Sequence, residues 1–192
     1  MFAAQQRDNV VGLVLVDATN PSVLTTMGEV GLPPIGKGAV VSFIMSNKVL
    51  YQIADRIGSI RVTYDIDLND FPPDAVPAER AFLLGHERAR TAVRELDFVS
   101  DTLRQIGSLS GAGSMPVVVI SSDRWIDKDP DIAGKRAEWN KKQQRNWLAI
   151  SSNSRFLIVP ESDHLSLLSK KDHAAAVSDA INRMVQSLKR RQ

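Results

Sequence analysis

The chain has 192 residues, of which 43% are hydrophobic and 24% are charged, and it contains no cysteine. This composition is typical of a globular protein with one sizeable core, and it excludes disordered and fibrous classes, disulfides and a cysteine nucleophile. The formal net charge of +2 depends partly on the terminal Lys189-Arg190-Arg191. We interpret this cluster as a solvated helix end, because no recognised nucleic-acid-binding module accompanies it. No nucleic-acid partner is therefore expected.

The longest apolar runs are VVGLVLV at 10–16 and AVVSFIM at 39–45. Both fall well short of the roughly 20 residues that a membrane-spanning helix requires. The amino terminus also lacks the order of basic, apolar and small-residue regions that marks a signal peptide. The sequence therefore predicts no membrane span and, by default, a cytoplasmic protein.

Three apolar segments predict strands, namely VVGLVLVDA (10–18), MPVVVISSD (115–123) and RFLIVPES (155–162). Apolar residues at successive positions are typical of strands in a parallel sheet that is buried on both faces. Amphipathic patterns predict one helix between the last two strands and another after the third. The order strand, helix, strand, helix indicates the α/β class.

The apolar residues of these two helices are the basis for the prediction. The first helix carries Trp139, Trp147 and Leu148, and the second carries Ala176, Ala180, Ile181, Met184 and Leu188. We interpret His86 and His173 as surface residues, since both lie in polar or amphipathic helical sequence.

The segment 20–113 separates the first two predicted strands and is far too long for a simple crossover. Its turn-rich start, its two helical stretches and the Pro-rich NDFPPDAVPAE between them indicate a helical insertion. We therefore expect core at 1–19 and 114–192, with a helical cap at 20–113.

The stretch FLIVPESDHLSLL (156–168) carries the sharpest candidate residue. The predicted strand ends at Pro160, and a turn then presents His164 before an apolar helix begins. An imidazole that titrates near neutrality can take a proton from a hydroxyl nucleophile and return it to a leaving group. The alternative is a loop histidine bonded to water or to Asp163.

The order of VVGLVLVDATNP, a helical cap, PVVVIS, a helix with Trp and Gln, SDHLSLL and a last amphipathic helix resembles the carboxy-terminal half of an α/β-hydrolase. The resemblance implies a partial α/β-hydrolase fold, with three parallel strands, flanking helices and a helical cap insertion. The family's triad runs Ser, then Asp or Glu, then His, and its His lies after the last strand, where His164 stands. The implied activity is hydrolysis of a small ester-like substrate without a cofactor, and no metal-ligand spacing or glycine-rich phosphate loop points to another chemistry.

Two carboxylates fit the acid of such a triad. Asp17 ends the first predicted strand, where some branches of the family carry it, and Asp123 follows the second, which is the commoner position. A carboxylate in either place would orient the imidazole and stabilise imidazolium. We favour Asp17, because its neighbours on the strand side are apolar, whereas the loop after Asp123 is heavily charged, with Asp127 and Asp129 close behind. The alternatives are a capping role for Asp17 and a turn role for Asp123.

The chain contains no G-x-S-x-G elbow. The segments GSLSG (107–111) and GAGSM (111–115) have the wrong spacing and lie in the predicted linker that returns to the sheet. The resemblance places the nucleophile about eight residues before Met1. It thus implies a truncated enzyme that is inactive alone.

Two further expectations follow from an incomplete hydrolase fold. A non-catalytic hydrolase-like binding domain, or one half of a split assembly, remains the alternative function. An unpaired edge at the first strand also predicts self-association.

Overall fold

A computed structural model describes residues 6–32, 50, 52, 72–83, 86–107 and 111–190. The chain divides into two compact units, one formed by Met1–Pro33 with Leu103–Gln192 and the other by Pro34–Thr102. In the second unit the structure describes mainly helices, α6 (Val76–Leu83) and most of α7 (His86–Gly107). The predicted cap at 20–113 is therefore described only in part, and its boundaries stay a prediction.

The first unit contains an open sheet of three parallel strands in the order β1 (Leu13–Val16), β2 (Val117–Ser122) and β3 (Ser154–Val159). Leu13 lies opposite Val117, which in turn lies opposite Ser154. The sheet with its flanking helices confirms the predicted α/β class. Each strand is shorter than its predicted segment, because the polar and Pro-containing ends of the segments form turns.

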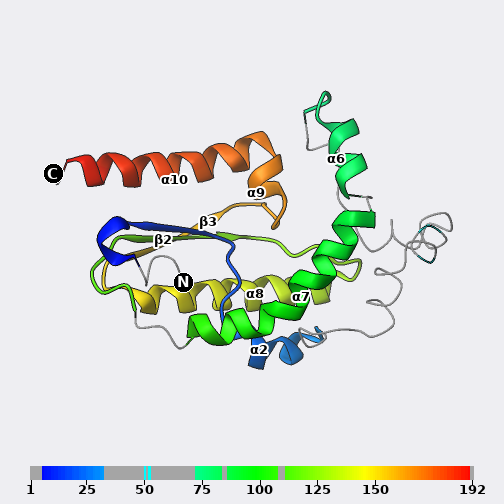
Figure 1. The fold of residues 1–192 in the computed structure, drawn as a ribbon, viewed down its shortest axis with the longest axis horizontal. Helices are drawn as coiled ribbons and strands as arrows, with labels where there is room; N and C mark the ends of the chain where they lie inside the picture. Colours follow the sequence, from blue (N-terminus) through cyan, green and yellow to red (C-terminus); the bar gives the residue numbers. More distant parts are fainter. Residues whose placement is uncertain are drawn as a thin grey trace. The chain divides into compact units, whose positions relative to one another are not determined.

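Helices cover both faces of this sheet, as Figure 1 shows, with α10 (Lys171–Lys189) on one side and α8 (Pro130–Asn146) on the other. Because successive strand residues point to opposite faces, both faces need apolar side chains. The α10 face has a core of Ile120, Val159, Leu167, Val177 and Ala180. The α8 face has a core of Val117, Val119 and Trp147. Burial on both faces explains the apolar run of the central strand β2, whereas β1 is partly buried and β3 has exposed residues such as Leu157.

Five shorter elements complete the described part of this unit. They are η1 (Arg7–Asn9), α2 (Val23–Thr26), η2 (Met27–Val30), η4 (Trp147–Ile150) and α9 (Ser166–Ser169). Among all helices that the structure describes, none is long and apolar enough to cross a membrane.

The buried stripe of α10 differs from the predicted one. Its buried residues are His173, Val177 and Ala180, whereas Ala176 and Ile181 are exposed. The interpretation of His173 as a surface residue was therefore wrong. Its side chain is buried because a polar partner is present, since its Nδ1 lies 3.0 Å from the Ser166 hydroxyl.

The packing of α9 gives a test of the core. Leu167 is fully buried among sheet and α10 residues, whereas its neighbour Leu168 is 73% exposed. We expect Leu167→Ala to lower the free energy of unfolding by about 2–5 kcal/mol, because it removes apolar contacts and leaves a cavity. Leu168→Ala should change it by about 0.5 kcal/mol or less. Urea titration of both variants measures the difference, and equal losses would contradict this packing.

Candidate active site

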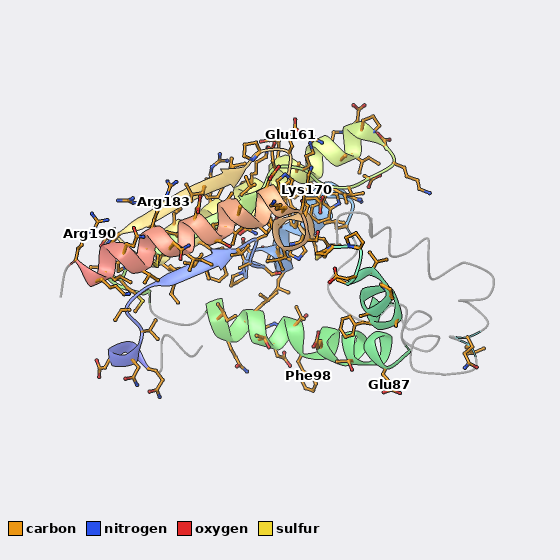
Figure 2. All side chains as sticks on the ribbon, turned by 90° about the horizontal axis from the view of Figure 1, so that it is seen from above. Glu87, Phe98, Glu161, Lys170, Arg183 and Arg190 are labelled. Atoms are coloured by element: carbon orange, nitrogen blue, oxygen red, sulfur yellow. The ribbon has the colours of Figure 1, made fainter. Side chains whose placement is uncertain are left out.

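Three loops meet at one end of the sheet, because the strands are parallel and their carboxyl ends lie together. Asp17 directly follows β1, Ser122 ends β2, and His164 lies in the loop after β3. In Figure 2 this loop lies between the labelled Glu161 and Lys170, at the opposite end of α10 from Arg190. Residues 147 positions apart in the sequence are thus brought into contact.

The central contact joins the imidazole of His164 to the carboxylate of Asp17. Nδ1 of His164 lies 2.8 Å from Oδ2 of Asp17. The Asp17 side chain is only 5% exposed, whereas the His164 side chain is 71% exposed. An ionised carboxylate accepts hydrogen bonds only, so Nδ1 must carry the hydrogen and Nε2 of the neutral ring is the free basic atom. The pair can therefore accept a proton from a group that approaches from solvent.

Asp17 is held by more than the histidine. Its Oδ1 accepts hydrogen bonds from the backbone N–H of Ser122 at 3.2 Å and from the side-chain amide of Asn140 at 3.0 Å. Its Oδ2 accepts a bond from the Ser122 hydroxyl at 3.0 Å in addition to the one from His164. The backbone of Asp17 has a φ of +43°, in the left-handed region that non-glycine residues seldom adopt. Such a conformation costs on the order of 1–3 kcal/mol and persists only where the surroundings fix it.

These contacts set the protonation of the pair. Burial by itself raises the pKa of Asp17, but the hydrogen bonds from His164, Asn140 and Ser122 outweigh it and leave that pKa below its ordinary value of 3.8. The hydrogen bond to Asp17 is the main reason that the pKa of His164 lies above its ordinary value of 6.5, and the negative charge of Asp163 adds to the effect. Near neutrality Asp17 is ionised and His164 is poised to gain a proton.

The loop that carries His164 is fixed by its own hydrogen bonds. The carboxylate of Asp163 accepts the backbone N–H groups of Leu165 and Ser166 at 2.9 and 3.0 Å. The Ser166 hydroxyl in turn accepts the backbone N–H of Asp163 at 2.8 Å and contacts the buried His173. Asp163 therefore shapes the turn, and the reciprocal bonds resemble a capping box at the start of a helix.

Asp123, the alternative acid, lies in a different network. Its Oδ1 forms an ion pair with Lys141 at 3.2 Å, and its Oδ2 accepts the backbone N–H of Glu161 at 3.1 Å. The bond from Glu161 is the largest of the effects that lower the pKa of Asp123 below its ordinary value of 3.8. Asp123 therefore ties the loops after β2 and β3 together, and the structure brings Asp17, not Asp123, to His164. The catalytic roles of these residues stay predictions.

The two later carboxylates of the same loop also have structural partners. Asp129 caps α8, because its carboxylate accepts the backbone N–H groups of Asp131 and Ile132. Asp127 forms an ion pair with Arg136.

Two residues of the site were not predicted from the sequence. Ser122 and Asn140 both bond to Asp17, and the Asn140 amide also donates to the Ser122 hydroxyl at 3.2 Å. The position of Ser122 at the end of a predicted strand could have indicated a role. Asn140 gives no such signal, since it is one polar residue among many in a helix rich in Lys, Gln and Arg.

The structure gives no described serine the position of a nucleophile beside His164. The Ser122 hydroxyl is buried and donates to Asp17, and among the described residues His164 bonds Asp17 and not a serine. Residues 108–110 of the GSLSG segment lie outside the described part of the chain. Within that described part, no group of three or more His, Asp or Glu side chains could hold a metal ion.

Comparison with known proteins gives no family assignment. No family model matches the chain, and no curated protein matches it. The arrangement of three parallel strands and helices is compatible with a partial α/β fold, and the α/β-hydrolase relationship remains a proposal.

The signs of the two pKa shifts predict a pH dependence of stability. The raised pKa of His164 stabilises the fold fully below 6.5, and this contribution is lost as the pH rises through the folded-state pKa. The lowered pKa of Asp17 stabilises it above 3.8, and this contribution is lost as the pH falls through the folded-state pKa. The free energy of unfolding of wild type should therefore exceed that of His164→Gln most between pH 3.8 and 6.5.

We expect a small difference, of about 1 kcal/mol or less, because solvent screens an exposed imidazole. Urea unfolding of both proteins over a pH series measures it. A difference that stays constant from pH 4 to pH 9 would mean that no ion pair forms in solution.

Proposed function

We propose that Asp17 and His164 are the acid and base of a serine hydrolase of the α/β-hydrolase type, which acts on a small ester-like substrate. The nucleophilic serine would be supplied by a segment outside these 192 residues, on the same or another polypeptide. The 2.8 Å contact between His164 Nδ1 and the buried Asp17 carboxylate carries the proposal. An exposed Nε2, oriented by a buried acid through the other ring nitrogen, is the arrangement that a hydroxyl nucleophile requires.

The proposed chemistry assigns one task to each group. Nε2 of His164 would take the proton of the serine hydroxyl as the serine attacks the ester carbonyl, and would give it to the departing alcohol. In the second half of the reaction the same nitrogen would take a proton from a water molecule as its oxygen attacks the acyl carbonyl. It would then give that proton to the serine oxygen as the bond to the acyl group breaks and the carboxylic acid is released. Asp17 keeps Nδ1 protonated throughout and stabilises the imidazolium that forms in each half.

The free edge of β1 supports a partner segment. The backbone N–H groups of Leu13 and Asp17 donate to the carbonyl oxygens of Pro116, directly before β2, and of Ile120 within β2. Because strand residues alternate in direction, Val14 and Val16 direct their backbone N–H and C=O groups to the other side. Within the described residues no strand pairs with that side of β1. A further parallel strand there would end beside Asp17. It could place an elbow serine at the same carboxyl end of the sheet as Asp17 and His164.

A reconstituted enzyme tests the function. The chain is joined to, or co-expressed with, a strand, G-x-S-x-G and helix segment from its upstream gene or from a close α/β-hydrolase, and ester turnover is measured. His164→Ala should remove nearly all turnover. Asp17→Asn should lower kcat by a factor on the order of 10⁴, because the amide favours the wrong tautomer.

Asp123→Asn is the matched control and should cost much less, since Asp123 bonds Lys141 and not His164. If Asp123→Asn abolished turnover while Asp17→Asn kept it, the acid would be misassigned. The chain alone should not react with a fluorophosphonate, and specific labelling of Ser114 or Ser122 would place the nucleophile inside the chain instead.

The open edge of β1 also predicts self-association of the chain when it is expressed alone. An unpaired apolar strand is a template for pairing with another copy. Light scattering should give a molar mass that rises with concentration. Val14→Pro should reduce this rise, because it removes an N–H that faces the open edge and leaves the bonds to β2 intact. A monomer at high concentration with a cooperative thermal transition would contradict the prediction.

A further inference from the structure

One side of α8 is directed at the segment that follows β1. Four residues at helical spacing bond to this segment, namely Asn140, Gln143 and Gln144 of α8 and Trp147, which caps its carboxyl end. Residues at i, i+3, i+4 and i+7 share one face of a helix. Most of this face is polar and buried, whereas a helix that covers a sheet commonly buries an apolar stripe.

We propose that Asn140, on this face, positions the Asp17 carboxylate and keeps it ionised so that it can orient His164. The inference extends the proposed function, because it assigns positioning residues to the same acid and base pair. Asn140 and Ser122 bond Asp17 and each other, whereas His164 bonds Asp17, so we assign the two residues a role that acts through Asp17.

The direction of each bond follows from the chemistry of the groups. The Asp17 carboxylate can only accept, so the Asn140 atom 3.0 Å from it must be the amide nitrogen. The second hydrogen of that nitrogen goes to the Ser122 oxygen at 3.2 Å. The hydroxyl hydrogen of Ser122 is then free to point at Asp17, 3.0 Å away. The bonds run in one direction towards the carboxylate, and each polarises the next.

Two other residues of the face hold the backbone next to Asp17. The side chains of Gln144 and Trp147 both donate to the carbonyl oxygen of Ala18, at 3.0 and 2.9 Å. Gln143 bonds the hydroxyl of Ser22, which Asn146 also contacts at 3.0 Å. The left-handed turn at Asp17 is therefore held from both its side chain and the next residue.

The need for these donors follows from burial. A carboxylate removed from water becomes protonated unless several hydrogen bonds favour its charged form. An Asp17 carboxylate that is protonated, or that is displaced from His164, would lose its attraction for imidazolium, and the pKa of His164 would fall. Asp17 and Asp163 are the charged groups that raise the pKa of His164. Asp163 is bound within its own turn, so a change at Asn140 should act on His164 through Asp17 alone.

The pKa of His164 is thus a direct readout of the positioning. The chain has three histidines, so a sample labelled with ¹³C at the imidazole Cε1 gives three signals in an NMR pH titration. Asp17→Asn defines the midpoint of His164 without its acid. The His164 midpoint of Asn140→Leu should be lower than that of wild type. The decrease should be a measurable fraction of the decrease seen in Asp17→Asn.

Gln143→Leu is the matched control. It removes a buried amide one turn further along α8, and the described partner of that amide is Ser22, not Asp17. Its His164 midpoint should equal that of wild type. The signal of the buried His173 reports in every variant whether the core remains folded.

If Asn140→Leu fails to fold, Ser122→Ala provides the second test, because it deletes one donor to Asp17 and keeps the backbone N–H bond. It should also lower the His164 midpoint. An unchanged midpoint in a folded Asn140→Leu or Ser122→Ala variant would overturn the positioning role. A failure of the proposed function itself would be seen in a different experiment. The reconstituted Asp17→Asn enzyme would then keep full turnover, whatever the titration gives.

Discussion

The burial of one carboxylate at the end of β1 is the constraint on which the site depends. Asp17 is almost inaccessible to water, and its backbone is in the left-handed region. Either feature alone would destabilise the fold. Four hydrogen bonds, two to each oxygen, make the arrangement acceptable, and one of them comes from His164. The two residues therefore depend on each other: His164 donates one of the bonds that stabilise the buried carboxylate, and the carboxylate orients His164.

Helix α8 has two tasks that its sequence combines. Trp139 and Trp147 are buried, and their indole N–H groups donate to Thr26 and Ala18. The indoles thus provide apolar area and hydrogen bonds together. Gln143 and Gln144 are nearly inaccessible, which amides seldom are unless polar groups face them. This helix covers one face of the sheet and also meets the polar needs of the segment after β1.

The sequence was sufficient to predict the strands and the class of fold, because burial on both faces of a parallel sheet leaves continuous apolar runs. His164 and Asp17 were predicted through the resemblance to α/β-hydrolases, which implies a base after the last strand and an acid at a strand end. The structure brings their side chains together, and their catalytic roles stay predictions. The stripe of α10 was predicted less well. Alanines are tolerated on either side of a helix, so Ala176 could not be told from Ala180, and His173 is buried only because Ser166 provides a polar partner.

The support of Asp17 could not be predicted for a related reason. Asn140 lies 123 positions from Asp17, and nothing in a helix of Lys, Gln and Arg distinguishes an amide that faces a buried acid from one that faces water. The type of a side chain shows which hydrogen bonds it can form. The rotation of its helix and the register of the strands decide which partner it contacts. Between Asp17 and Asp123, apolar neighbours indicated the more buried acid, and burial is also what makes its partners necessary. Several donors are needed to keep a buried acid ionised, and their bonds fix its position. The buried Asp17 carboxylate can therefore orient an imidazole more firmly than a more exposed carboxylate such as Asp123, which pairs with Lys141.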